Sequence, residues 1–259
     1  MKKEFNIFLN ALIFYTRIPV RKNIKYSEKI LNKATRWFPF IGIIVGSASA
    51  LVFIAASFIL PSVISILLSM FFSIYLTGAF HEDGFADFCD GFGGGNSKEK
   101  ILEIMKDSRI GTYGSIGIIS VLSAKFFTLL NIDVEYIPVL LISGHSFSRI
   151  FPVLIIYSLP YAREDLSSKV KPVGHKGSVT GFIFAFLTGI TPLIFIPLLS
   201  LAVIIPCAFL TFIIFRWYIK RKLEGYTGDV LGALQQLMEV IFYLSFLVYE
   251  YKIMNYFQW

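Results

Sequence analysis

The sequence has little charge and almost no cysteine. Charged residues make up 16% of its 259 residues, whereas soluble domains carry about a quarter. Its two cysteines, Cys89 and Cys207, stand in a polar motif and in an apolar run, so they are not expected to pair. The chain also lacks internal repeats, low-complexity tracts and zinc-type His and Cys spacing, and we expect no cleaved signal peptide. A soluble globular domain and a disulfide-linked secreted protein are therefore excluded.

Long apolar stretches are what the chain has instead. Hydrophobic residues make up 56% of it and gather in runs near the ~20 residues that a helix needs to cross a bilayer. We predict an all-α, polytopic membrane bundle that forms a single domain over residues 1–259. The predicted spans are Trp37–Leu60, Pro61–Phe80, Gly111–Leu130, Ile137–Tyr157, Val179–Pro197, Leu198–Phe215 and Val230–Val248. The fifth and sixth share one apolar run, divided near Pro197. Residues 5–15 are too few to cross and predict an N-terminal interfacial helix.

The positive charges predict the orientation of the bundle. Nearly all of the 24 Lys and Arg fall on one side if the N-terminus is cytoplasmic. They lie in four segments: Lys2–Arg36, Lys98–Arg109, Arg163–Lys176 and Arg216–Lys222. By the positive-inside rule, the N-terminus and two polar loops, 81–110 and 159–178, are expected in the cytoplasm. The net charge of +7 follows from this topology, so nucleic-acid binding is not needed to explain it.

The most informative stretch is 81–95, which reads HEDGFADFCDGFGGG. In a helix, Asp83, Asp87 and Asp90 share one face, where their carboxylates repel one another unless a cation neutralises them. Oxygen ligands of this kind suit Mg²⁺ or Mn²⁺. Glu82 and Asp229, the latter at the inner end of the last span, are further candidate ligands. A solvated acidic helix start is the alternative for the motif, and a helix N-cap is the alternative for Asp229.

Glycines and basic residues follow the carboxylates. Gly93 and Gly94 belong to a run whose backbone N–H groups could approach a phosphate. Next, Ser97–Lys106 predicts a short helix capped by Ser97, and 105–114 reads MKDSRIGTYG. Its candidate phosphate ligands are Lys106, Ser108 and Arg109. Anchoring of the membrane interface explains the same basic residues equally well.

Charged and polar side chains also occur inside the predicted spans. His145 and Arg149 share one face of the fourth span, and a fixed charge there usually faces the bundle interior, where it could bind an anionic substrate. In the last span, Gln236 and Glu239 share a face with Asp229. Lys125, near the outer end of the third span, is interpreted as a side chain that snorkels outward to the interface.

Several of these blocks together resemble the cobalamin synthase family, the adenosylcobinamide-GDP ribazoletransferases. They stand in family order over nearly the whole chain: FYTRIPV at 14–20, RWFPFIG at 36–42, HEDGFADFCDGFGGG, ILEIMKDSRIGTYG, HSFSRIFPVLIIYSLPYAR at 145–163 and GYTGDVLGALQQLMEV at 225–240. The departures are small: Phe85 and Phe92 replace aliphatic residues, and Cys89 replaces a small one.

The resemblance implies a Mg²⁺-dependent enzyme of the bacterial inner membrane. It would transfer the adenosylcobinamide-phosphate moiety of adenosylcobinamide-GDP to α-ribazole or its 5′-phosphate and release GMP. The five carboxylates would hold the metal, Asp87 and Asp90 would be catalytic with Asp90 as the proton acceptor, and Arg163 would join the substrate-binding residues. The number of metal ions stays open, and a homo-oligomer is compatible with the sequence.

Two other functions remain as alternatives. CDP-alcohol phosphotransferases, which transfer lipid headgroups, use a related motif of the form DGxxAR, but here the residue that follows the alanine is Asp87 and not arginine. A cation or solute transporter would place its acidic residues near the bilayer midplane, with repeated or broken helices. The acidic residues here are predicted at the inner boundary.

Overall fold

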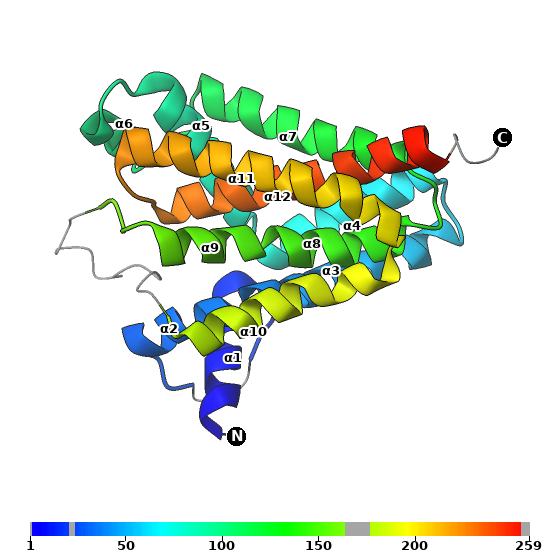
Figure 1. Ribbon diagram of the computed structural model, residues 1–259, viewed down its shortest axis with the longest axis horizontal. Helices are drawn as coiled ribbons and strands as arrows, with labels where there is room; N and C mark the ends of the chain where they lie inside the picture. Colours follow the sequence, from blue (N-terminus) through cyan, green and yellow to red (C-terminus); the bar gives the residue numbers. More distant parts are fainter. Residues whose placement is uncertain (1, 21–23, 164–176, 255–259) are drawn as a thin grey trace.

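The computed structural model describes residues 2–20, 24–163 and 177–254 and shows a bundle of helices (Figure 1). Within these residues there is no β-strand, only an isolated bridge between Tyr161 and Tyr226. The helices are α1 (Lys2–Tyr15), α2 (Glu28–Ala34), α3 (Phe38–Ser57), α4 (Ser62–Thr77), α5 (Phe80–Gly94), α6 (Lys98–Ile104), α7 (Thr112–Leu130), α8 (Ile137–Ser148), α9 (Ile150–Ser158), α10 (Val179–Ile190), α11 (Leu201–Leu223) and α12 (Gly228–Val248). The predicted all-α membrane bundle is confirmed.

The predicted spans correspond to helices, with one correction. Five helical stretches are long and apolar enough to cross a membrane: Glu28–Ser57, Thr112–Leu130, Ile137–Ser158, Leu198–Leu223 and Gly228–Lys252. A sixth, Val179–Phe195, is shorter, and the chain is extended at Ile196 before helical structure resumes at Leu198, which confirms the division near Pro197. The second expected span, Pro61–Phe80, is wrong as a single helix, because α4 ends at Thr77 and is long enough to cross only together with α5, across a sharp bend. In place of the seven expected spans, the described residues give five, or six if this bent pair forms one span.

A sharp break separates α4 from α5. Gly78 and Ala79 both have left-handed backbone, with φ of 69° and 58°, and the two helices meet at 87°. The carboxylate motif, expected in a loop over 81–110, is therefore a helix that packs against α12 and α7. Only the second part of the segment 81–110 contains loop. There, the Ser97 hydroxyl accepts a hydrogen bond from the N–H of Lys100 and caps α6, as predicted.

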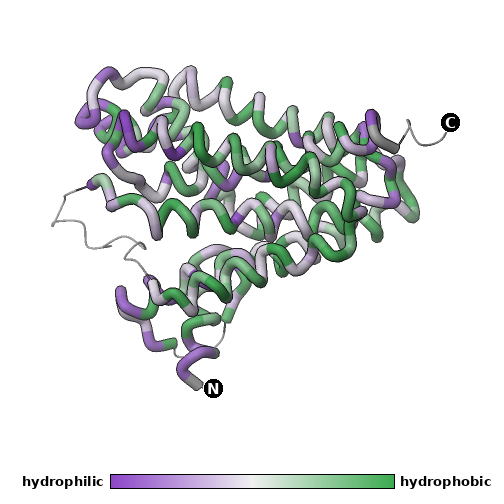
Figure 2. Tube along the Cα trace, in the orientation of Figure 1, coloured by the Kyte–Doolittle hydropathy of each residue, from purple (hydrophilic) through white to green (hydrophobic). Residues whose placement is uncertain are grey.

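The polar residues gather at one end of the bundle. Figure 2 shows hydrophilic segments at the end that carries α2, α6 and the connection from α11 to α12, with hydrophobic helices running away from it. The basic segments predicted to share one side do so, as far as they are described. Helix α1 runs across the long axis at this same end and packs on α2 and α3 (Figure 1). Its 14 residues are too few for a span, as expected.

Small residues bring α3 and α8 together in the apolar part. A Cβ on Gly46 would lie 2.6 Å from the carbonyl oxygen of Leu141 and 2.7 Å from the Cα of Ile142. Lipid gives helices no hydrophobic reason to associate, so van der Waals packing at such close contacts holds them together.

We predict that Gly46→Ala destabilises the bundle by about 1–3 kcal/mol, since the new methyl group must push two backbones apart. Thermal unfolding in detergent measures this. The matched control is Gly228→Ala, because a Cβ at Gly228 meets no atom within 4 Å. Equal melting temperatures for the two variants would contradict the packing argument.

Candidate active site

Helices α5 and α12 touch where the carboxylates lie. A Cβ on Gly84 would meet the Cα of Asp229 at 3.0 Å, and one on Gly232 would meet the carbonyl oxygen of His81 at 3.2 Å. Glycine at both positions lets the two backbones pack almost in contact. The contact places Asp229, in the first turn of α12, beside the carboxylates of α5.

Three of the five predicted carboxylate ligands face one another at this contact. Asp83 is exposed, Asp87 and Asp229 are partly exposed, and the carboxylate of Asp87 is repelled by those of both Asp83 and Asp229. Asp83 and Asp87 lie one turn apart on α5 and so share a face. Asp229 accepts hydrogen bonds from the Arg163 guanidinium (2.9 Å) and the Thr227 hydroxyl (3.2 Å).

A short backbone bridge holds Arg163 next to Asp229. The N–H of Ala162 donates to the carbonyl oxygen of Tyr226 (2.9 Å), and the N–H of Tyr226 donates to that of Pro160 (3.1 Å). Burial raises the pKa of the Tyr161 phenol, which also lies in this bridge. Arg163 therefore belongs to the site, as predicted, whereas residues 164–176 of the second expected loop lie outside the described residues.

Asp90 points away from the other carboxylates and caps α7. It is 9% exposed, and it accepts from the N–H groups of Gly111 (2.7 Å) and Gly114 (2.8 Å). These N–H groups belong to the first turn of α7, which has no side-chain cap of its own, so the carboxylate satisfies donors that the helix leaves open. A Cβ on either glycine would collide with this carboxylate. Asp90 thus joins the carboxylate motif to the segment 105–114.

Three of the predicted phosphate ligands, Gly94, Lys106 and Arg109, line an open basin of about 890 Å³ at the end of α5, whereas Gly93 and Ser108 do not line it. Among its walls are Asp90, Gly94, Lys106, Arg109 and Gly111. Arg109 is exposed and pairs with Asp107 (2.7 Å), and hydrogen bonds from Arg109 lower the pKa of Asp107 to about 2. Ser108 is exposed between them. Gly93 lies under the ring of Tyr113, whose Cγ would be 2.5 Å from a Cβ there.

Glu82, His145 and Arg149 lie in the bundle interior, apart from the carboxylate cluster. Glu82 is 8% exposed and accepts from the Gln236 amide (2.9 Å). Arg149 is 1% exposed; its guanidinium donates to the carbonyl oxygen of His145 (2.6 Å) and lies 5.3 Å from the ring centre of Phe38. The structure therefore does not bring these three side chains to the carboxylates of Asp83 and Asp87.

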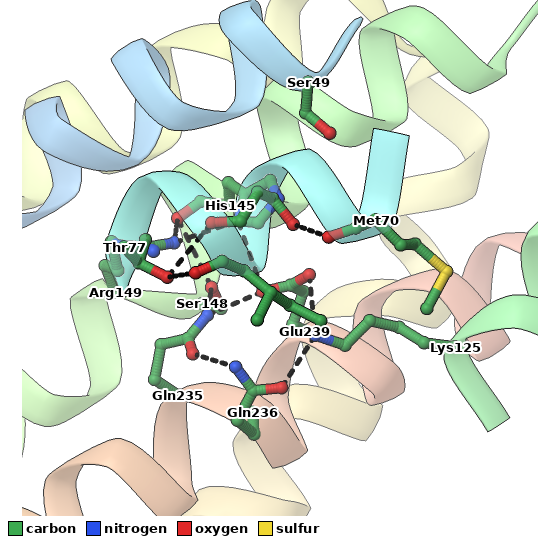
Figure 3. Close-up of polar contacts among 12 residues, drawn as sticks. Ser49, Met70, Thr77, Lys125, His145, Ser148, Arg149, Gln235, Gln236 and Glu239 are labelled. Atoms are coloured by element: carbon green, nitrogen blue, oxygen red, sulfur yellow. Dashed lines mark hydrogen bonds and ion pairs between the residues drawn. The ribbon is translucent and has the colours of Figure 1, made fainter. Parts of the chain in front are cut away.

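A buried polar network around Glu239 is the feature that the sequence did not reveal (Figure 3). Glu239 pairs with Lys125 (3.1 Å), lies 3.4 Å from Nδ1 of His145 and accepts from the Gln235 amide (2.6 Å). Lys125 also donates to Gln236 (2.7 Å) and is 5% exposed. The interpretation of Lys125 as an outward-snorkelling side chain is therefore wrong. A lysine within an apolar span was the available signal, since such a charge needs an internal partner.

Comparison with known proteins assigns the family. The family model described as cobalamin-5-phosphate synthase matches residues 7–247. The chain belongs to this family. A Shewanella amazonensis protein named adenosylcobinamide-GDP ribazoletransferase is 41% identical over 252 residues, covering 95% of this chain and 96% of the relative. Relatives of the same name from Leptospira interrogans (42%; 96% and 97% covered) and Vibrio cholerae (40%; 96% and 96%) are similar to the same extent. No solved structure matches the chain.

The family resemblance implies that the enzyme uses a magnesium ion. Whether such an ion fits depends on the carboxylates of the site. Among the described residues, no group of three or more His, Cys, Asp and Glu side chains is gathered closely enough to hold a metal ion. Magnesium, however, is usually bound through one or two carboxylates, with waters and substrate phosphates completing its coordination. Asp83, Asp87 and Asp229 supply partly exposed oxygen ligands and fit a site of that kind. Glu82 and Asp90 are buried and accept hydrogen bonds within the protein, whereas Asp229 accepts hydrogen bonds but stays partly exposed.

We predict different stabilities for two aspartate variants of the motif. Asp90→Asn places an amide N–H₂ against N–H donors of α7 and should cost about 1–2 kcal/mol, as loss of a helix cap does. Asp87→Asn removes a repelled charge and should leave the melting temperature unchanged or raise it. Thermal unfolding of both variants in the same detergent compares them. A melting temperature for Asp90→Asn as high as that of the unaltered protein would contradict the capping role.

We also predict that Glu239→Gln destabilises the bundle by about 3–5 kcal/mol, because it leaves the Lys125 ammonium buried without its carboxylate. Lys125→Met in the same chain should recover much of this loss. A double-mutant cycle of melting temperatures measures the coupling between the two residues. Strictly additive effects would show that the two residues do not interact.

Proposed function

We propose that this protein is a Mg²⁺-dependent adenosylcobinamide-GDP ribazoletransferase of the bacterial inner membrane. It transfers the adenosylcobinamide-phosphate moiety to α-ribazole, or to α-ribazole 5′-phosphate, and releases GMP. The observation that carries the proposal is the close α5–α12 contact, which brings Asp229 next to the helix that bears Asp83 and Asp87. At the end of this helix lies a basin whose walls include Lys100, Lys106 and Arg109 as well as Glu103 and Asp107. Clustered carboxylates next to basic side chains suit the transfer of a substituted phosphate group.

The polar end of the bundle faces the cytoplasm in this proposal. The basic residues of α2, α6 and the end of α11 gather there, and an excess of Lys and Arg is typical of the cytoplasmic side. Both nucleotide substrates would then reach the site from the aqueous phase. The corrin ring, with its cobalt, is part of the transferred substrate and takes no part in the chemistry.

The carboxylates would hold Mg²⁺ on the pyrophosphate of the donor. Asp83, Asp87 and Asp229 are the candidate ligands, and the bound ion would neutralise negative charge on the pyrophosphate and on departing GMP. Lys106 and Arg109 line the basin next to them and are suited to bind phosphate oxygens. Arg163, paired with Asp229, would fix the orientation of that carboxylate.

The transfer itself is a displacement at the cobinamide-side phosphorus. A ribose hydroxyl oxygen that is free in both α-ribazole and α-ribazole 5′-phosphate bonds to this phosphorus, the bond to the bridging pyrophosphate oxygen breaks, and GMP leaves with that oxygen. The hydroxyl proton passes to a carboxylate. Asp90 was the first candidate for this role, but its two N–H contacts support a positioning role, which leaves Asp83 and Asp87 as candidates.

We predict that Asp87→Asn lowers the rate of GMP release by about 100-fold or more, as loss of a group that stabilises transition-state charge does. The assay uses full-length protein in liposomes with adenosylcobinamide-GDP and α-ribazole. EDTA should abolish the activity of the unaltered protein, and added Mg²⁺ should restore it.

The matched control is Asp133→Asn, which removes an exposed carboxylate between α7 and α8, at the opposite end of the bundle. It should leave the rate unchanged. Near-normal activity of Asp87→Asn at saturating Mg²⁺ would contradict the ligand role. No GMP release by folded protein would contradict the reaction, and CDP-alcohol substrates would be tested next.

A further inference from the structure

A second cavity lies at the other end of α5 from the basin. It has a volume of about 190 Å³ and is enclosed by α1, α9 and the first turns of α3, α5 and α12. Its apolar walls include five aromatic side chains: Phe14, Tyr15, Phe38, Phe80 and Tyr161. Asp229 and Arg163 line it as well. The cavity is therefore aromatic, and it also reaches the carboxylate cluster.

Three buried polar atoms of residues that line this cavity lack a hydrogen-bond partner among the described residues: Thr35 Oγ1, His81 Nε2 and Arg163 Nε. His81 is 2% exposed, and its Nε2 has no hydrogen-bond partner among the described residues. Its ring stacks on that of Phe38, with centres 5.5 Å apart and planes at 21°, so its orientation is set by packing. Leaving a buried donor or acceptor unpaired costs about 1–3 kcal/mol. A ligand with one matching polar atom would remove that cost.

We propose that this cavity binds the base of the acceptor nucleoside, with His81 Nε2 donating to its free ring nitrogen. This proposal rests on the function proposed above. The benzimidazole base of α-ribazole is flat and apolar and keeps one unsubstituted ring nitrogen as an acceptor, which matches aromatic walls that hold the unpartnered Nε2 of His81. Asp229 lines the cavity and adjoins Gly84, so a base bound here directs its ribose toward Asp87.

The other parts of the substrates fit this cavity poorly. Guanine carries several donors and acceptors on its edges, and those that face the aromatic part of the walls would be buried without partners, which is costly. A corrin ring is far larger than a cavity of about 190 Å³. The donor therefore belongs to the open basin and the acceptor base to the aromatic cavity.

The test compares Michaelis constants for the two substrates in liposomes. His81→Phe keeps the ring stacking but removes the donor, so it should raise KM for α-ribazole about three- to tenfold. Leu231→Trp fills the cavity from α12 and should raise KM for α-ribazole about tenfold or more. In both variants KM for adenosylcobinamide-GDP should change by less than about twofold. The control Leu198→Trp, on a side chain that is 82% exposed and does not line the cavity, should change neither constant.

Equilibrium dialysis of α-ribazole without the donor separates this proposal from the proposed reaction. Binding that is lost in Leu231→Trp supports the cavity even if no GMP is released. GMP release with unchanged α-ribazole binding and KM in both variants overturns the cavity assignment and leaves the reaction standing. A rise confined to KM for adenosylcobinamide-GDP also overturns the assignment of the cavity to the acceptor base. Because each variant alters the cavity from a different helix, either one that folds is sufficient for the test.

Discussion

The buried ion pair between Glu239 and Lys125 is the constraint on which the rest of the bundle depends. Both side chains are at most 6% exposed, in a part of the molecule that lipid surrounds. There, charges must be paired inside the protein, because no water is present to solvate them. Four helices supply the partners: α7 gives Lys125, α8 gives His145, α12 gives Glu239 and Gln236, and α5 gives Glu82 (Figure 3). These contacts fix how the four helices stand relative to one another.

The network explains why a polar helix is stable against an apolar bundle. The first turns of α5 face inward with Glu82, which Gln236 binds, and its last turns face α7 through Asp90, which caps that helix. Both oxygens of Asp90 therefore have defined donors, and Glu82 is bound through Oε1, while its Oε2 is buried without a partner among the described residues. Asp83 and Asp87 lie on the remaining face of α5. The helix holds them in position, and they take part in neither of these contacts. Pairing the buried carboxylates with the protein keeps the outer ones available for ligands.

The sequence predicted the parts of this arrangement that depend on local pattern. Apolar run length gave the spans, Ser97 gave the start of α6, and helical periodicity put Asp83 and Asp87 on one face. The sequence could not predict which distant segments contact one another. Asp90 and Gly111 are 21 residues apart, and periodicity does not tell which neighbour a face meets. Lys125 was misjudged for the same reason, since its partner lies 114 residues further on in α12.

The positions of the two binding regions follow the geometry that an in-line displacement needs. The aromatic cavity touches α5 at Phe80 and His81, and the basin touches it at Asp90 and Gly94. At 1.5 Å per residue these contacts lie about 15 Å apart, with Asp83 and Asp87 between them. An acceptor hydroxyl arriving from one end and a guanosine phosphate leaving toward the other would be on opposite sides of the phosphorus. In the proposed reaction, this one helix, placed by its buried carboxylates, would bring the nucleophile to one side of the phosphorus and let the leaving group depart on the other.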